Sequence, residues 1–238
     1  MIAIVTGAGT GIGRAIACAL VQQGHHVALV GRTEATLQET ASLASDGPGE
    51  TLLSVGDVAD ETAITTTVRD VLQRWGRIDI LVNNAGNNIP RRTIAETDMQ
   101  GWRSVLDTNL TGVYVCTRAV LPVMRKQARG QIINIVSDAA HRTTLKAGAA
   151  YAAAKHGALS LTESILLEAS DDGIRATAVM PGDVNTPILD RRPVPPLPEA
   201  RERMLQPEDV AAAVVFLTNL PQRANVEEMV IRPSRRVQ

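Results

Sequence analysis

Tyr151 and Lys155 are the residues whose types and spacing most directly suggest chemistry in this sequence. They stand four residues apart in a segment with a helical pattern, so their side chains share one helix face about one turn apart. A phenol has a pKa of about 10, and it needs a nearby cation to exchange a proton with a carbonyl oxygen near neutral pH. Lys155 is placed to supply that charge. Taken alone, the spacing favours a plainer interpretation, a boundary aromatic followed by a solvated lysine.

Two further polar residues argue against that plainer interpretation. Ser137 ends a predicted strand, and open α/β sheets place their sites at the carboxyl ends of strands. Its hydroxyl is suited to hold a substrate oxygen beside a tyrosine. Asn109 lies within a predicted helix, where a polar amide in an otherwise apolar stretch is not explained by packing. The predicted catalytic residues are therefore Asn109, Ser137, Tyr151 and Lys155.

A glycine-rich turn, T-G-A-G-T-G-I-G over residues 6–13, follows the first predicted strand and leads directly into a helix. Glycine lets the backbone turn sharply and approach a pyrophosphate closely. The helix N-terminus then offers free N–H groups and a partial positive charge to the phosphates. The spacing is T-G-x-x-x-G-x-G, because Ile12 stands where the G-x-G-x-x-G pattern has its last glycine. The alternative is a turn that only packs the helix on the strand, but the position after the first strand favours a dinucleotide site.

The end of the second predicted strand bears on which dinucleotide is bound. An acidic residue there would accept hydrogen bonds from the adenosine ribose of NAD, whereas an arginine suits the 2′-phosphate of NADP. The chain has Gly31 followed by Arg32, so we expect NADP(H) in preference to NAD(H). The alternative is that Arg32 is a solvated residue beside a helix start capped by Thr33.

The elements that must position these residues alternate regularly along the chain. Short apolar runs predict strands at 2–6, 26–30, 51–55, 78–83, 131–137, 175–180 and 227–231. Helical patterns lie between them at 11–22, 33–44, 61–75, 99–128, 149–170 and 207–220. This alternation predicts one α/β domain over residues 1–238, a doubly wound, mostly parallel seven-stranded sheet of the Rossmann kind with helices on both faces. The proline-rich segment 183–206 is too long for an ordinary connection, so we expect a mobile substrate lid or disorder there.

Composition excludes several other classes of protein. The 24 Lys and Arg against 25 Asp and Glu leave no net positive field to hold nucleic acid or an anionic membrane. The longest uncharged apolar stretch, residues 210–217, is too short to span a bilayer. The first strand starts at Ile2, so we expect no targeting peptide. Both cysteines, Cys18 and Cys116, lie in apolar helical patterns that predict buried thiols rather than a disulfide, so we expect a cytoplasmic protein.

Taken together, these motifs make the chain resemble the short-chain dehydrogenase/reductase (SDR) family over almost its whole length. The residues that carry the resemblance are Thr6-Gly7 with Gly11-Ile12-Gly13, Asp57-Val58, Asn83-Asn84-Ala85-Gly86, Asn109, Ser137, Tyr151 with Lys155, and Pro181-Gly182. The resemblance implies an oxidoreductase that moves a hydride between a nicotinamide cofactor and a carbonyl or secondary alcohol, such as a 3-oxoacyl compound, a small hydroxy acid or a ketone. It also implies a homo-oligomer, either a dimer or a tetramer.

The same resemblance assigns roles to individual residues. Tyr151 would be the general acid/base, and Ser137 would position the substrate carbonyl. Lys155 would lower the pKa of the tyrosine and bond the nicotinamide ribose, and Asn109 would hold a water in a proton relay to that lysine. Asp57 would bond the adenine amino group, unless it only caps the following helix. The predicted cofactor-binding residues are Gly7, Gly9, Thr10, Gly11, Ile12, Gly13, Arg32, Asp57, Val58, Asn84, Ala85, Gly86, Tyr151, Lys155, Pro181, Gly182, Val184 and Thr186.

The substrate side of the site is less defined by the sequence. The residues expected around the substrate, besides segment 183–206, are Asn87, Asn88, Asp138, His141, Arg142 and Lys146. The residues that raise the idea of an anionic substrate are Arg91, Arg92, Arg142, Arg191 and Arg192. Surface arginines are usually only solvated, so the idea stays open. The histidines lack metal-ligand spacing, and no metal is expected.

Other functions remain as alternatives at this point. A cofactor-binding regulator with little catalysis would have an incomplete catalytic set, whereas all four predicted catalytic residues are present. A nucleotide-sugar epimerase would use a similar tyrosine and lysine but needs a larger substrate domain. An enoyl reductase normally carries a wider spacing between the tyrosine and the lysine.

Overall fold

The chain forms one seven-stranded sheet in which every strand pairing is parallel. A computed structural model describes residues 1–234. The strands are β1 (Ile2–Thr6), β2 (His26–Gly31), β3 (Thr51–Val55), β4 (Ile80–Asn83), β5 (Gly130–Ile135), β6 (Ile174–Pro181) and β7 (Glu228–Ile231). Their order, β3-β2-β1-β4-β5-β6-β7, confirms the predicted doubly wound architecture. The order reverses between β1 and β4, and a ligand crevice is expected at that point in such a sheet.

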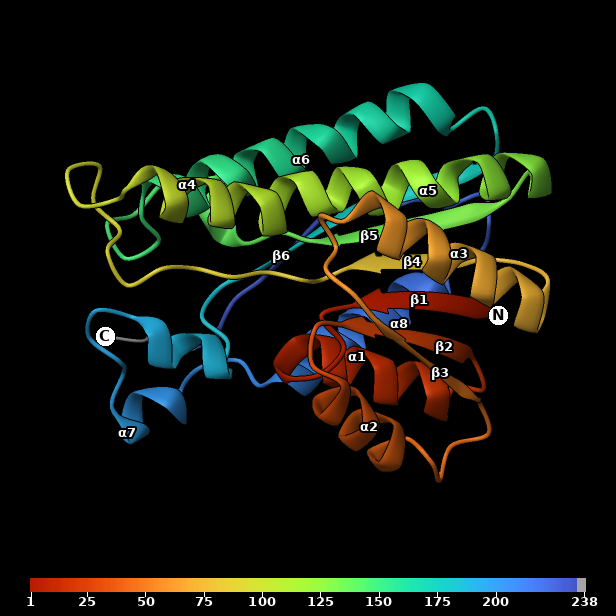
Figure 1. Cartoon of the computed structure of the whole chain (residues 1–238), viewed down its shortest axis with the longest axis horizontal. Coiled ribbons are helices and arrows are strands. Elements are labelled where there is room, and N and C mark those ends of the chain that lie inside the picture. Colours follow the sequence, from red (N-terminus) through yellow and green to blue (C-terminus); the bar gives the residue numbers. More distant parts are fainter. Residues whose placement is uncertain (235–238) are drawn as a thin grey trace.

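Helices cover both faces of the sheet (Figure 1). On one face lie α1 (Gly11–Gln22), α2 (Glu34–Leu43) and α8 (Pro207–Thr218), and on the other lie α3 (Glu61–Trp75), α4 (Met99–Leu106), α5 (Gly112–Gln127) and α6 (Ala149–Ala169). The short helix α7 (Pro198–Arg201) lies apart from these layers. Each face of the sheet has its own apolar core, one packed against α1 and α8 and the other against α3, α5 and α6. The strands between these cores are apolar on both sides, as in other covered parallel sheets.

A series of hydrogen-bonded polar side chains crosses the apolar centre of the sheet. The Asn83 side chain donates to the Asn134 Oδ1 on the neighbouring strand at 2.9 Å, and the Asn134 Nδ2 donates to the Thr162 hydroxyl on α6 at 2.8 Å. All three side chains are buried. Because buried polar groups are costly unless they are paired, these bonds fix the position of α6 relative to β4 and β5.

The helix predicted over residues 99–128 is not one regular α-helix. It is interrupted by a π-helical turn, Asp107–Thr111, between α4 and α5, and Asn109 lies inside this turn. The prediction of one regular helix was wrong. A π-helical turn adds one residue between hydrogen-bonded partners, and the spacing of apolar residues in the sequence does not reveal this addition. Such π-helical turns are often found at functional sites. Strand β5 also ends earlier than predicted, at Ile135, so that Ser137 lies just beyond the strand.

Segment 183–206, predicted as a lid or disorder, contains short helices in the structure. A 3-10 helix, Pro187–Arg191, is followed by α7, and both begin with proline. Leu189, Met204 and Leu205 are buried, and Val184 pairs with Leu205 in a parallel bridge that joins the two ends of the segment. In Figure 1 the segment projects beside the main body. Among the described residues, none of the helices is sufficiently long and apolar to cross a membrane.

Asp60, and not Asp57, caps α3. The Asp60 Oδ1 accepts hydrogen bonds from the backbone N–H groups of Thr62 and Ala63 at 2.8 and 3.2 Å. The Asp57 Oδ1 accepts only from the N–H of Ala59, outside the helix. The alternative that Asp57 serves as the helix cap is therefore wrong. Its second carboxylate oxygen, Oδ2, lies 3.7 Å from the Arg32 Nη1.

We predict that Asp60→Ala lowers the free energy of unfolding by about 1 kcal/mol, since it removes the acceptor for two helical N–H groups. Asp60→Asn keeps an acceptor and should lose much less. Asp46→Ala is the matched control, because Asp46 is an exposed aspartate in a turn. Chemical denaturation measures all three variants. Equal losses for Asp60→Ala and Asp46→Ala would show that the cap adds nothing.

Candidate functional site

The turn after β1 requires glycine at several of its positions. Gly7 and Gly11 have positive φ angles of 64° and 52°, which favour glycine. A Cβ at Gly13 would lie 2.2 Å from the Gly7 carbonyl oxygen, so this position also needs glycine. At the start of α1, Thr10 makes no side-chain capping bond and the first turn carries no acidic residue. The free N–H groups and the helix dipole therefore favour an anion at this end of α1.

Side chains from three other elements hold this turn in place. The Thr6 hydroxyl accepts from the backbone N–H groups of Asn84 and Ala85, each at 3.0 Å. The Asn84 Nδ2 donates to the Thr6 carbonyl oxygen at 2.9 Å, so the loop after β4 is tied to the glycine turn. From the helical side, Arg14 donates to the Gly9 carbonyl oxygen at 2.6 Å. Arg14 was not among the residues predicted from the sequence, although its place directly after Gly13 was the available signal.

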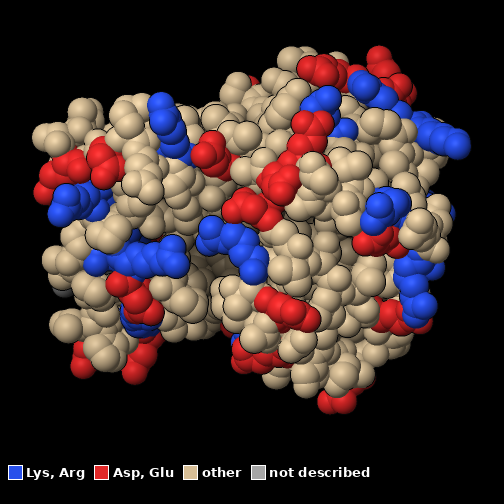
Figure 2. All heavy atoms as spheres, viewed as in Figure 1, with Lys and Arg blue, Asp and Glu red and all other residues tan. Residues whose placement is uncertain are grey.

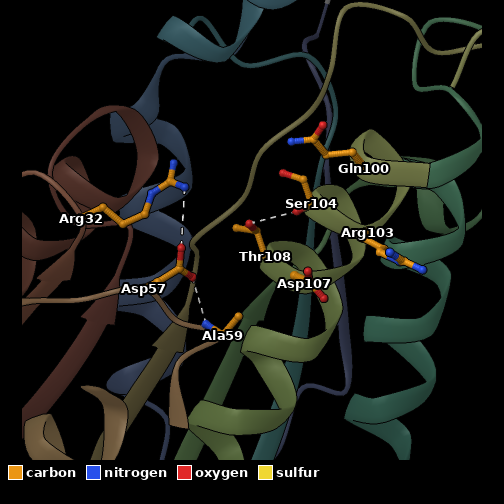
Figure 3. A pocket seen from close by; sticks show the side chains of 8 residues that line it. All are labelled: Arg32, Asp57, Ala59, Gln100, Arg103, Ser104, Asp107 and Thr108. Carbon is orange, nitrogen blue, oxygen red and sulfur yellow. Dashed lines mark hydrogen bonds and ion pairs between the residues drawn. The ribbon is translucent and has the colours of Figure 1, made fainter. Parts of the chain in front are cut away.

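Arg32 and Asp57 line an open pocket of about 420 Å³ at the ends of β2 and β3 (Figure 3). Their nearest charged atoms, Nη1 and Oδ2, are 3.7 Å apart, and the Arg32 side chain is 61% exposed. Arg103 belongs to the same pocket, but Figure 3 shows its side chain pointing away from Arg32. The pocket thus presents one exposed guanidinium group at its β2 side, next to the glycine turn.

Three more of the predicted cofactor residues, Val58, Gly86 and Thr186, follow the carboxyl ends of strands β3, β4 and β6. Thr186 lies against the glycine turn, since a Cβ on Gly11 would come within 3.1 Å of its Cγ2. Gly86 borders the catalytic residues, since a Cβ there would lie 3.0 Å from the Asn109 Oδ1 and 4.0 Å from the Lys155 Nζ. Val58 is buried against Gly112, since a Cβ there would lie 2.5 Å from the Val58 Cγ2. These positions form one path from the β2 end to the β5 end of the sheet.

The structure brings Tyr151, Lys155 and Ser137 together at the end of β5. Lys155 is 4% exposed, and its Nζ donates to the Ile135 carbonyl oxygen at 2.9 Å. The same nitrogen lies 5.6 Å from the centre of the Tyr151 ring. The Ser137 side chain is close enough to the Tyr151 hydroxyl to lower its pKa. Ser137, which follows β5, therefore lies in one cluster with Tyr151 and Lys155, which share a face of α6.

The environment shifts the pKa of both titratable groups in this cluster. Burial lowers the pKa of Lys155 to about 8, so the ammonium form still predominates at pH 7. Burial raises the pKa of the Tyr151 hydroxyl, and the nearby Ser137 side chain opposes that rise. Asp138 raises the same pKa further, whereas the charges of Arg92 and Arg192 lower it. The net shift for Tyr151 is upward in the protein alone.

Asn109 is fully buried in the π-helical turn, next to Gly86. Its Nδ2 donates to the Asn87 carbonyl oxygen and to the Asn87 Oδ1, both at 2.9 Å, and to the Val105 carbonyl oxygen at 2.8 Å. Its Oδ1 has no hydrogen-bond partner. A buried acceptor without a partner is costly, so this atom suits a water or a ligand group.

Most residues expected around the substrate are used within the protein. The side-chain amide of Asn87 donates to Ser104, and that of Asn88 donates to the Ala147 carbonyl oxygen. His141 bonds Glu228 at 3.0 Å. Lys146 is paired with Asp183. Arg142 lies exposed in the same loop. Within residues 1–234, no three His, Cys, Asp or Glu side chains gather as a metal site.

Comparisons with known proteins identify the family to which this chain belongs. A sequence profile of the short chain dehydrogenase family matches residues 1–194. An uncharacterised oxidoreductase of Staphylococcus saprophyticus is 35% identical over 233 residues, covering 98% of this chain and 97% of that protein.

Two solved structures are similar over nearly the whole chain. An alcohol dehydrogenase from the archaeon Thermococcus sibiricus, complexed with 5-hydroxy-NADP, is 29% identical with a TM-score of 0.88, covering 100% of this chain and 98% of that one. The closed form of a serine dehydrogenase complexed with NADP+ is 31% identical with a TM-score of 0.87, covering 98% and 95%. Sequence profile, relatives and fold agree, and the chain belongs to the short-chain dehydrogenase/reductase family of oxidoreductases.

Proposed function

We propose that the protein is an NADP(H)-dependent oxidoreductase that interconverts a carbonyl compound and a secondary alcohol. The observation that carries the proposal is the cluster of Tyr151, Lys155 and Ser137 at the end of β5, on the same sheet edge as the glycine turn. A regulator with idle chemistry has no need to bury a lysine beneath a tyrosine. The neutral Tyr151 hydroxyl is suited to donate a proton, and the Ser137 hydroxyl is suited to hold the oxygen that receives it.

Each residue of the cluster has a distinct task in this proposal. In the reductive direction Tyr151 donates its proton to the carbonyl oxygen, and in the oxidative direction it accepts the alcohol proton. Lys155 supplies positive charge beneath the phenol and bonds the nicotinamide ribose, while the unpartnered Asn109 Oδ1 holds a water that relays protons toward that lysine. When bound, the nicotinamide supplies or accepts the hydride.

The choice of NADP(H) over NAD(H) rests on the pocket at the end of β2. Gly31 leaves the strand end without a carboxylate that would repel a 2′-phosphate, and Arg32 is exposed beside it. An arginine forms charge-assisted, often bidentate hydrogen bonds with phosphate. The alcohol dehydrogenase and the serine dehydrogenase noted above were solved with NADP-type dinucleotides, which supports the same choice.

Segment 183–206 is proposed to act as a lid over the catalytic cluster. It begins directly after Gly182 at the carboxyl end of β6, and Thr186 already contacts the glycine turn. Closure of such a segment would exclude water from the hydride path. A cytoplasmic location and a homo-oligomeric state stay predictions from the sequence.

We predict that Tyr151→Phe lowers turnover by about 10² to 10⁴, since it removes the proton donor and leaves the ring. Affinity for NADPH, followed by quenching of protein fluorescence, should stay nearly unchanged. Tyr114→Phe is the matched control, because Tyr114 is the only other tyrosine in the sequence and is 51% exposed. Tyr151→Phe enzyme that turns over any good substrate at a near-normal rate would refute the assignment.

We predict that Arg32→Ala lowers the preference for NADPH over NADH, measured as the ratio of the two kcat/KM values. A hydrogen bond to a charged group contributes about 1.5–3 kcal/mol, which corresponds to roughly tenfold to a hundredfold in this ratio. Arg103→Ala is the control, because that arginine lines the same pocket but points away. A parent enzyme that favours NADH, or a ratio that Arg32→Ala does not change, would exclude recognition of the phosphate at this position.

A further inference from the structure

Arg92 is a buried cation that, within residues 1–234, donates hydrogen bonds only to uncharged backbone groups. Its side chain is 7% exposed and donates to three backbone carbonyl oxygens, those of Ile89 at 2.7 Å, Lys146 at 2.7 Å and Arg191 at 3.2 Å. Each of its three nitrogens makes one of these bonds. A guanidinium group has five N–H donors, so one donor on each terminal nitrogen is left. A buried charge is stable only when it is paired or fully hydrogen-bonded.

A second arginine lies beside it in segment 183–206. The Arg192 side chain is 16% exposed, and its Nη2 donates to the Asp183 Oδ1 at 2.7 Å. Lys146 also pairs with Asp183, through the other carboxylate oxygen. Lys146 and Arg192 therefore share one carboxylate, and together with Arg92 they give this cluster an excess of positive charge. Figure 2 shows the surface hollowed between its left and right parts, with charged side chains of both signs around the hollow.

The cluster lies next to the proposed catalytic residues. The Ala149 N–H, at the start of α6, donates to the Arg92 carbonyl oxygen at 3.2 Å. Tyr151 follows on that helix within one turn. A Cβ on Gly148 would lie 2.6 Å from the Arg92 Cβ, so the arginine packs directly against the helix start. The Arg92 Nη2 donates to the carbonyl oxygen of Arg191, the residue directly before Arg192. Burial lowers the pKa of Arg92, and the charge of Arg192 lowers it further, while both guanidinium charges lower the pKa of Tyr151.

Two arginines held close together repel one another, and an anion between them removes that cost. The nearby Asp138 has its own partner, since its Oδ2 lies 3.4 Å from the Arg232 Nε. A carboxylate on the substrate would accept hydrogen bonds from the unused N–H donors of Arg92 and would offset the repulsion between the two arginines. Arginine binds carboxylates through two parallel hydrogen bonds.

We propose that Arg92 and Arg192 form a carboxylate-binding subsite, and that the substrate is an oxo acid or the corresponding hydroxy acid. The inference rests on the proposed function, since it names the substrate class of the same site. In the reductive direction the keto carbon gains a C–H bond from the hydride of NADPH, which becomes NADP+. The carbonyl oxygen gains the Tyr151 proton, and the carboxylate is unchanged.

Acetoacetate and methyl acetoacetate test this subsite, because they present the same ketone with and without a negative charge. With saturating NADPH, we expect kcat/KM for the acid to exceed that for the ester by at least tenfold. Arg192→Gln should lower this ratio by tenfold or more, mainly by raising KM for the acid. Arg191→Gln, which changes the exposed neighbouring arginine, should leave the ratio unaltered. The shorter pyruvate and the longer levulinate, each beside its methyl ester, cover other spacings of the two groups.

A second measurement uses only the parent enzyme, so it does not depend on whether a variant folds. Butyrate should inhibit reduction of methyl acetoacetate competitively, whereas neutral butyramide of the same size should inhibit at least tenfold more weakly. Esters reduced as well as their acids, together with equal inhibition by butyrate and butyramide, would overturn the subsite and leave the proposed function intact. Failure of every acid and every neutral ketone or aldehyde to oxidise NADPH would overturn the proposed function itself.

Discussion

The rest of the site depends on the burial of one positive charge, that of Lys155. Its Nζ is held by the Ile135 carbonyl oxygen at the end of β5, and burial brings its pKa to about 8. Burying a cation without a carboxylate partner is costly, so the packing around it must hold it there. Ala150, Ala154 and Ala158 let α6 approach its neighbours closely, and the chain of bonds from Asn83 to Thr162 fixes its position. The lysine is thereby held beneath Tyr151.

The carboxyl ends of the strands place Lys155 on the same side of the sheet as the glycine turn after β1. The strand order reverses between β1 and β4, and there the Thr6 hydroxyl accepts from the backbone N–H groups of Asn84 and Ala85. Gly86 follows directly and borders both Asn109 and Lys155. The segment from β4 to Gly86 therefore holds the glycine turn on one side and touches the catalytic cluster on the other.

Much of this arrangement could be predicted from the sequence, because it follows from short-range patterns. β1, β3, α1 and α3 have the predicted boundaries, and Tyr151 and Lys155 share the predicted helix face. What could not be predicted depends on contacts between distant segments or on single hydrogen bonds. The π-helical turn at Asn109 differs from an α-helix by only one residue in its backbone hydrogen-bond spacing. Asp60 caps α3, although Asp57 was an equally suitable residue type for that position. Arg92 and Arg192 were two of five arginines that raised the idea of an anionic substrate, and the sequence could not show that Arg92 is buried or that both charges act on Tyr151.

The most direct test of the central claim is the ionisation of Tyr151 itself. The sequence has two tyrosines, so Tyr114→Phe leaves Tyr151 as the only phenol whose tyrosinate absorbance can be titrated. Burial raises its pKa in the protein alone, and the account requires the charge of Lys155 to lower it when NADP+ is bound. In the Tyr114→Phe enzyme saturated with NADP+, Tyr151 should ionise below the ordinary phenol value of about 10. Adding Lys155→Gln should move that transition upward. A phenol that ionises at or above pH 10 in both proteins would contradict the account.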